Sequence, residues 1–313
     1  MCTRWSSVTP AVEIQHLTKS FGPIKAVDDL NLSIEEGEMF GIVGPDGAGK
    51  TTTFRMLTGI LKPTDGTATI LGHDLLKDTD RIKKEIGYLS QRFSLYGDLT
   101  VDENIEFFAE INEVYEYRDR REELLAFTRL TAFRERLADQ LSGGMKQKLA
   151  LACTLIHKPK IIFLDEPTTG VDPVSRRDFW KILSDLLKEG ITIVMSTPYL
   201  DEAERCGRVA LVNQGKAMVV DTPQNTKKLL HGEVVELVCG RIRDASRLLK
   251  AHPAVQDVQA FGDRLNVIVQ DAERDLPSVR EALDRGGIQI EEWREISPSL
   301  ENVFISLMKR VGS

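Results

Sequence analysis

The stretch from Gly44 to Thr52 restricts the fold of this chain more than any other part of the sequence. It reads G-P-D-G-A-G-K-T-T and matches the pattern G-x-x-x-x-G-K-T of a loop that wraps a phosphate group. An apolar run of strand length, Met39–Val43, precedes it, and residues with helical spacing follow it. The loop is therefore predicted to join a buried strand to a helix N-terminus, where backbone N–H groups and the helix dipole favour an anion.

The residues of this loop have distinct expected contacts with a nucleotide. Glycines let the backbone approach a phosphate without a Cβ clash. Lys50 is expected to reach the β- and γ-phosphates, and the Thr51 hydroxyl is expected to hold Mg²⁺. The predicted nucleotide-binding residues of the loop are Gly44, Pro45, Asp46, Gly47, Ala48, Gly49, Lys50, Thr51 and Thr52.

The composition limits the class of protein. The 313 residues are 42% hydrophobic and 28% charged, which is ordinary for a soluble chain and long enough for one large domain and a small one. A net charge of −7 argues against a general nucleic-acid binder. We expect no signal peptide and no transmembrane helix, since no apolar run approaches about 18 residues. The four cysteines form no C-x-x-C pair and are predicted to be free thiols in a reducing compartment.

The order of apolar runs predicts an α/β fold. The runs Ile161–Leu164, Ile191–Ser196 and Val209–Val212 are expected to be buried strands, and they alternate with helical segments. That alternation is typical of a mostly parallel sheet with crossover helices. Residues 12–20 and 30–34 alternate apolar and polar positions, which predicts antiparallel strands ahead of the loop strand.

Two further segments differ from this core. Residues 95–140 are rich in Glu, Arg and Leu and are predicted to be a helical insert. From about residue 230 the pattern starts again in the order β-α-β-β-α-β, which predicts a small α+β domain. The predicted domains are 1–229, with its helical subdomain at about 95–140, and 230–313. No catalytic group of residues occurs in the second domain, so regulation or subunit contact is its predicted role.

Two carboxylates at the end of a buried strand add the chemistry of hydrolysis. Asp165 and Glu166 follow Ile161–Leu164 directly. Asp165 is expected to coordinate Mg²⁺, directly or through water. Glu166 is placed to polarise a water molecule for attack on a γ-phosphate.

Ser142, Gly143 and Gly144 begin a second predicted helix and form a second anion-binding N-terminus. One γ-phosphate does not need two such sites in one chain. The economical explanation is that this one serves a nucleotide held by another subunit. A serine N-cap followed by a glycine turn is the structural alternative.

Taken in order over residues 12–220, these motifs resemble the ATP-binding subunits of ABC transporters. The resemblance assigns Phe21 to stacking on adenine. It assigns Gln91 to the Q-loop glutamine, which contacts Mg²⁺ and water and faces the membrane subunit. It identifies Ser142–Gly144 as the family signature and Gly170–Pro173 as the D-loop.

Two segments narrow the resemblance to the exporter-type (ABC-2) branch, namely Asp201–Glu204 and Pro298–Phe304. The branch implies ATP and Mg²⁺ as cofactors and an ABC-2 membrane permease as partner, on which this chain would dock at the cytoplasmic face of the membrane. Tyr96–Val101 looks like the surface that receives the coupling helix of the permease. The family also implies a dimer in which each ATP lies between the loop of one ATP-binding domain and the signature of the other. The second domain can belong to an identical chain, a different chain or another half of a longer chain.

Pro198 departs from the family pattern. The family has a switch histidine in the Ser-Thr-His context that here reads Ser196-Thr197-Pro198. Proline has neither a side-chain donor nor a backbone N–H. Two readings remain open: a degenerate site whose partner carries the competent one, or a site in which Glu166 and Gln91 suffice with partial help from Tyr199. Asp46 is a milder departure, because the family often has asparagine there.

Other nucleotide-binding classes agree less well with the sequence. A GTPase would need an Asn-Lys-x-Asp motif, which is missing. A non-transport ABC ATPase is the main alternative, although such chains usually carry two cassettes or a coiled-coil insert. A nucleotide-gated scaffold with little turnover is a third possibility, and Pro198 is the feature that supports it.

Overall fold

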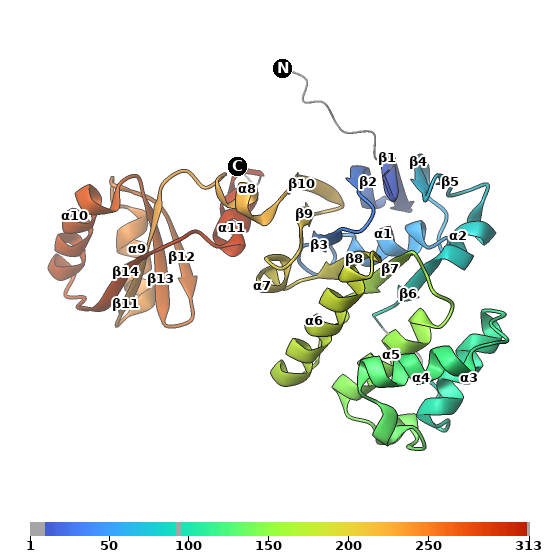
Figure 1. Cartoon of the computed structure of the whole chain (residues 1–313). Helices are drawn as coiled ribbons and strands as arrows, with labels where there is room; N and C mark the ends of the chain where they lie inside the picture. Colours follow the sequence, from blue (N-terminus) through green and yellow to red (C-terminus); the bar gives the residue numbers. More distant parts are fainter. Residues whose placement is uncertain (1–9, 92–94, 312–313) are drawn as a thin grey trace. The chain divides into compact units, whose positions relative to one another are not determined.

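The computed structural model describes residues 10–91 and 95–311, and the chain divides into two compact units between Asp221 and Thr222 (Figure 1). This division lies ahead of the boundary expected at 229/230. The reason is α8 (Pro223–Lys227), which packs on the last helix, α11 (Leu300–Val311), and so belongs to the second unit.

A six-stranded sheet forms the centre of the first unit. Its order is β10-β9-β3-β8-β7-β6, and all neighbours are parallel except the edge pair β10–β9. The mostly parallel sheet predicted from the sequence is thus confirmed. Both β3 and β7 are buried along their whole length, as their apolar runs predict. The bounds are β3 Met39–Val43, β6 Ile86–Leu89, β7 Ile161–Asp165, β8 Thr192–Thr197, β9 Arg208–Asn213 and β10 Lys216–Asp221.

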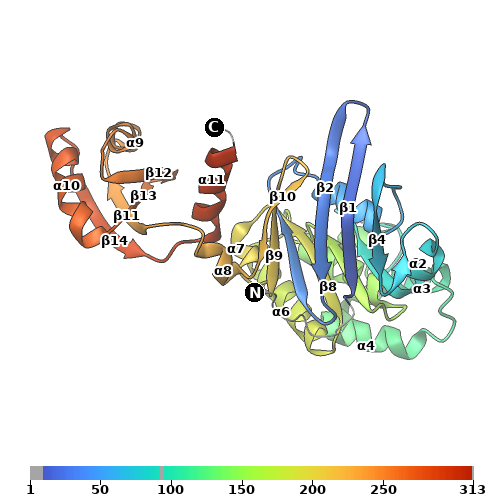
Figure 2. The same ribbon diagram turned by 90° about the horizontal axis from the view of Figure 1, so that it is seen from above.

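A second, antiparallel sheet comes from the N-terminal part of the chain, in the order β2-β1-β4-β5 (Figure 2). One hydrophobic cluster joins it to the central sheet and to α1 (Lys50–Leu57). In this cluster the Phe54 ring of α1 meets the Phe163 ring of β7 edge-on, 5.7 Å between centroids. The phosphate-loop helix is therefore fixed between two sheets. The strands are β1 Val12–Phe21, β2 Ile24–Ile34, β4 Asp65–Ile70 and β5 His73–Asp74.

Helices α3, α4, α5 and α6 of the first unit lie together on one side of the central sheet, whereas α2 packs on β5 and β6 (Figure 1). Within the predicted insert, α3 begins at a capping box in which Thr100 and Glu103 bond each other's backbone, and both α3 and α4 pack on α5. The bounds are α2 Thr79–Glu85, α3 Val101–Ile111, α4 Arg118–Thr128, α5 Gly143–Leu155, α6 Pro173–Lys188 and α7 Leu200–Ala203, with short 3₁₀ turns at Thr131–Phe133 and Ala138–Gln140.

The second unit has the predicted β-α-β-β-α-β order. Its antiparallel sheet runs β12-β13-β11-β14, the arrangement of a split β-α-β fold. Successive residues of β11 belong to different hydrophobic clusters: Val235 packs with α9 and α10, and Val234 packs with α11. Helices therefore cover both faces of this sheet. The bounds are β11 Glu233–Cys239, α9 Ile242–Lys250, β12 Val255–Phe261, β13 Arg264–Val269, α10 Ala272–Arg285 and β14 Ile290–Ile296.

Two expectations from composition concern the whole chain. Among residues 10–91 and 95–311, no helix is both long enough and apolar enough to cross a membrane. Cys153, Cys206 and Cys239 are buried free thiols, and Cys2 lies outside the described residues.

Candidate nucleotide-binding and hydrolysis site

The predicted phosphate loop connects β3 to α1. Gly49 has φ +99°, and a Cβ there would lie 2.3 Å from the Ala26 carbonyl oxygen, so this position requires glycine. Lys50, Thr51 and Thr52 form the first turn of α1. The Asp46 side chain is exposed at the loop surface.

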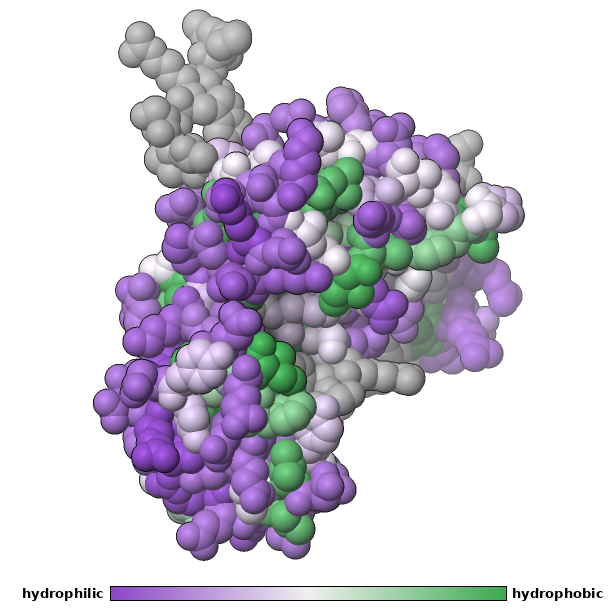
Figure 3. Space-filling model, turned by 90° about the vertical axis from the view of Figure 1, so that its right-hand side faces the viewer, coloured by the Kyte–Doolittle hydropathy of each residue, from purple (hydrophilic) through white to green (hydrophobic). Residues whose placement is uncertain are grey.

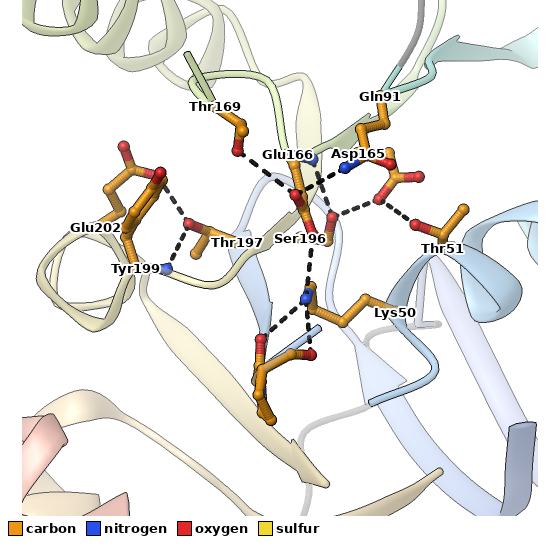
Figure 4. A network of polar contacts seen from close by, with 12 residues as sticks. Lys50, Thr51, Gln91, Asp165, Glu166, Thr169, Ser196, Thr197, Tyr199 and Glu202 are labelled. Atoms are coloured by element: carbon orange, nitrogen blue, oxygen red, sulfur yellow. Dashed lines mark hydrogen bonds and ion pairs between the residues drawn. The ribbon is translucent and has the colours of Figure 1, made fainter. Parts of the chain in front are cut away.

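Lys50 is a buried cation surrounded by oxygen atoms. Its Nζ donates hydrogen bonds to the carbonyl oxygens of Gly44, at 2.9 Å, and Pro45, at 3.1 Å. It also forms an ion pair with Glu166 Oε1 at 3.1 Å. The ammonium group thus lies between the phosphate loop and the end of β7 (Figure 4).

Asp165 lies at the carboxyl end of β7, directly opposite Ser196 of the neighbouring strand β8. Its Oδ1 accepts hydrogen bonds from Ser196 Oγ at 2.6 Å and from Thr51 Oγ1 at 3.2 Å. The Tyr88 hydroxyl donates to Oδ2 at 3.4 Å. Two strands of the central sheet, β6 and β8, and the helix α1 therefore each donate a hydrogen bond to this one carboxylate.

Glu166 has an unusual backbone for a residue with a side chain, φ +50°. Its N–H donates to Ser196 Oγ at 3.0 Å, and its Oε2 accepts from Gln91 Nε2 at 3.0 Å and from Thr169 Oγ1 at 3.4 Å. A left-handed conformation costs about 1–3 kcal/mol and persists where the surroundings enforce it, often at functional sites. Here it accompanies a side chain that meets both Lys50 and Gln91.

The structure brings together five residues that the sequence singled out: Lys50, Thr51, Gln91, Asp165 and Glu166 (Figure 4). Phe21 lies elsewhere, at the end of β1. It is half exposed, and the Lys19 ammonium lies 5.3 Å from its ring centre.

The signature residues also lie outside this group, at the start of α5. Ser142 caps the helix by accepting a hydrogen bond from the Met145 N–H at 3.3 Å. Gly144 is buried, and a Cβ there would lie 2.3 Å from Ser175 of α6. Gly143 is exposed, and a Cβ there would project into open space.

Ser196 and Tyr88 also contact the site residues, and neither was among the predicted site residues. Ser196 could have been found, because a polar residue ending a buried strand beside the strand of Asp165 reaches the same sheet edge. Tyr88 gave no such signal. Its burial, helped by the charge of Asp165, raises the pKa of its hydroxyl to about 12.

The segment around Pro198 forms a turn after β8. Thr197 Oγ1 accepts a hydrogen bond from the Tyr199 N–H at 3.0 Å and donates one to Glu202 at 2.9 Å. The Tyr199 ring lies against Arg176 of α6, 4.9 Å from its guanidinium carbon. Tyr199 is thus directed to α6.

Comparison with known proteins agrees with this geometry. A family model described as ABC transporter matches residues 27–169. A second, described as ATP-binding protein DrrA1-3-like, C-terminal domain, matches residues 222–308. The daunorubicin resistance ATP-binding protein DrrA2 of Streptomyces coeruleorubidus is 34% identical over 304 residues, which cover 95% of this chain and 94% of that protein. The chain belongs to the ATP-binding subunits of ABC transporters.

Two other relatives of this ABC ATP-binding subunit are informative. The probable multidrug ABC transporter ATP-binding protein YbhF of Escherichia coli K12 is 44% identical over 221 residues, but the match spans only 38% of that longer protein. The dimeric structure of a post-hydrolysis state of the cassette MJ0796, bound to ADP and Pi, has 30% identity and a TM-score of 0.60, covering 67% of this chain and 98% of that one. The ABC ATP-binding fold of the first unit is thereby established.

Proposed function

We propose that this ABC ATP-binding subunit binds Mg-ATP and hydrolyses it, as part of a dimer, to power export through an ABC-2 type permease at the cytoplasmic face of a membrane. The observation that carries the proposal is the convergence of Lys50, Gln91 and Glu166 at 3.0–3.1 Å beside the phosphate loop. A cation, an amide and a carboxylate at the end of a strand are the groups that hydrolysis of a phosphoanhydride requires.

The donor atoms fit a magnesium ion. The Thr51 hydroxyl and the Asp165 carboxylate are hard oxygen ligands that already lie 3.2 Å apart, and Gln91 offers an amide oxygen from the neighbouring segment. When bound there, Mg²⁺ would be held by Thr51 and Asp165 and would supply positive charge that offsets the negative charge of the phosphate groups.

Within this site, Glu166 is proposed to act as the base that polarises the attacking water. Gln91, which donates to the same carboxylate, is proposed to orient it. Lys50 is proposed to offset negative charge on the β- and γ-phosphates, since backbone carbonyls of the loop already hold its ammonium group in place.

Of the two signature glycines, Gly143 supports a site shared between subunits. Packing of α5 on α6 explains why position 144 is glycine, because any Cβ would overlap Ser175. No contact among the described residues explains Gly143, which faces open space at a helix N-terminus. A bare backbone there suits a phosphate group brought by a second ATP-binding domain. Together with Ser142, these residues are proposed to hold the nucleotide of that domain.

Export through a permease is supported by relatives named for drug resistance and by the match of the second unit to a C-terminal domain of such subunits. Figure 3 shows apolar patches on an otherwise hydrophilic face of the first unit. Tyr96 is 45% exposed, and its ring meets the ring of Phe107 of α3 edge-on, with 4.4 Å between the ring centroids. This aromatic pair is proposed to be part of the permease contact.

Hydrolysis by the isolated protein is expected to be slow because of Pro198. A histidine at this position would add one hydrogen-bond donor to the γ-phosphate, and removing one such donor typically costs about 10²–10³ in rate. The other residues proposed to carry hydrolysis lie close together, which supports a slow ATPase over an inert scaffold.

Steady-state ATP hydrolysis of four proteins tests the function: wild type, Lys50→Ala, Glu166→Gln and Pro198→His. Wild type should exceed the first two variants clearly, and Pro198→His should raise kcat about tenfold or more. A wild-type rate equal to that of Glu166→Gln would refute hydrolysis and favour a scaffold. A brisk wild-type rate that Pro198→His leaves unchanged would show that the proline does not limit the site.

A further inference from the structure

Glu202 lies at the centre of a second polar cluster, beside the group around Glu166 (Figure 4). It belongs to the short helix α7 and is only 1% exposed. Thr168 Oγ1 lies 2.7 and 2.8 Å from its two carboxylate oxygens, and Thr197 Oγ1 donates to Oε2 at 2.9 Å. A buried carboxylate is costly unless hydrogen bonds and an opposite charge compensate it, so these contacts hold it in a defined place.

Arg176 of α6 supplies the opposite charge. Its Nε lies 3.5 Å from Glu202 Oε1, and its guanidinium stacks on the Tyr199 ring at 4.9 Å. The helix that carries Arg176 is capped by Asp172, which accepts hydrogen bonds from the N–H groups of Val174 and Ser175. The cluster therefore reaches the start of α6 as well as the ends of two strands.

The two threonines lie at the carboxyl ends of adjacent parallel strands, Thr168 in the turn after β7 and Thr197 as the last residue of β8. Thr168 lies in the turn after Glu166, where the Thr169 N–H donates to the Glu166 carbonyl oxygen at 3.2 Å. Thr197 closes the turn that contains Pro198, by accepting from the Tyr199 N–H. One carboxylate thus ties the turn that carries the proposed base to the turn that carries the proline.

We propose that Glu202 is a positioning residue for ATP hydrolysis, which acts through Thr168 and Thr197 to hold these two turns in one arrangement. The inference rests on the proposed hydrolytic function. Because Pro198 has no side-chain donor, it cannot help to position the reacting groups. The placement of Glu166 therefore depends on contacts with other residues of the protein. Displacement of a catalytic group by about 1 Å can cost about 10²-fold in rate. The proposed phosphate contacts of Lys50 do not involve Glu202, so substitution of Glu202 should leave the affinity for ATP unchanged.

Matched substitutions test this role in single-turnover ATP hydrolysis, with ATP affinity and Tm measured on the same samples. Thr168→Val removes the hydroxyl while keeping the shape of the side chain, and Thr168→Ser keeps the hydroxyl. Glu202→Gln removes the charge, and Asp201→Asn is the exposed control on the same helix. Thr168→Val and Glu202→Gln should slow hydrolysis about tenfold or more with ATP affinity unchanged, whereas Thr168→Ser and Asp201→Asn should resemble wild type.

Three results would overturn the proposal. Thr168→Val and Glu202→Gln could hydrolyse ATP within about twofold of wild type while Glu166→Gln is inactive, which would refute the positioning role and leave the proposed function intact. Hydrolysis, ATP affinity and Tm could fall together, which would show a general structural role. Wild type could be no faster than Glu166→Gln, in which case hydrolysis itself would be refuted and the role of Glu202 with it.

Discussion

At the scale of single residues, the site depends on side chains placed by strand pairing. Asp165 and Ser196 meet because β7 and β8 are parallel neighbours in register, and Glu166 turns back toward Lys50 because its φ is +50°. Tyr88 adds a buried hydroxyl to the same carboxylate. This arrangement makes the stability of the unit depend on pH at the alkaline end.

Replacement of Tyr88 by phenylalanine should reduce alkaline destabilisation. The pKa of Tyr88 is raised to about 12 in the folded protein, mainly by burial, against about 10 when unfolded. The folded state therefore binds the Tyr88 hydroxyl proton more tightly than the unfolded state does. The free energy of unfolding that this difference contributes is fully present below pH 10 and is lost as pH rises toward 12. The loss is about 1–2 kcal/mol, allowing for solvent screening of a partly exposed group.

The measurement is Tm from pH 8 to 11 for wild type, Tyr88→Phe and the control Tyr115→Phe, which alters a side chain that is 81% exposed. Wild type and the control should lose Tm in parallel, and Tyr88→Phe should lose less. Parallel curves for all three would show that Tyr88 does not carry the effect.

At the scale of elements, much of the site could be predicted from the sequence and part of it could not. The strand–loop–helix unit around Lys50 and the carboxylates after β7 follow from local patterns of glycines and apolar runs. The cluster of Thr168, Thr197 and Glu202 joins two turns and a short helix, and no local pattern reports which of many polar residues will be buried together. The division near residue 222 differs from the predicted boundary at 229/230 for a similar reason. The helix α8 packs on α11, which lies far away in the sequence, and so belongs to the second unit.

The signature helix α5 allows a prediction that separates packing from partner contact. Gly144→Ala places a Cβ 2.3 Å from Ser175 and should destabilise the first unit by about 1–3 kcal/mol. Gly143→Ala places a Cβ with no other described residue within 4 Å of it, apart from its neighbours in the helix, and should leave the free energy of unfolding within about 0.5 kcal/mol. If position 143 faces the nucleotide of a second domain, the same change should weaken dimerisation driven by ATP.

Urea unfolding and sedimentation in ATP, both in the Glu166→Gln background, provide the two readouts. Gly143→Ala should lower the dimer fraction at unchanged stability. Normal dimerisation of that variant would argue that the signature does not contact the partner's nucleotide.

At the scale of the whole molecule, nucleotide chemistry and permease contact are proposed to occupy separate parts of the first unit. The chemistry lies at the carboxyl ends of β7 and β8 and in the phosphate loop. The proposed permease contact lies on the aromatic pair of Tyr96, in the segment between Gln91 and α3, and Phe107, within α3. If hydrolysis and permease contact are linked through that segment, a change that removes the permease contact should leave ATP hydrolysis by the isolated protein intact.

Tyr96→Ala should therefore separate hydrolysis from coupling. It removes an aromatic side chain that is 45% exposed, while the Tyr96 backbone keeps its hydrogen bonds with the side chain of Asn104, at 3.0 Å each. ATP hydrolysis by the isolated variant should stay within about twofold of wild type, because none of the hydrolysis residues changes. The amount of ABC-2 permease that co-purifies with it should fall by about tenfold, as expected when an aromatic anchor is lost from an interface.

Tyr115→Ala, which removes a more exposed tyrosine of the same helical subdomain, should alter neither readout. Equal permease recovery with Tyr96→Ala and wild type would exclude the aromatic pair as the contact, and a parallel loss of hydrolysis would mean that Tyr96 supports the fold instead.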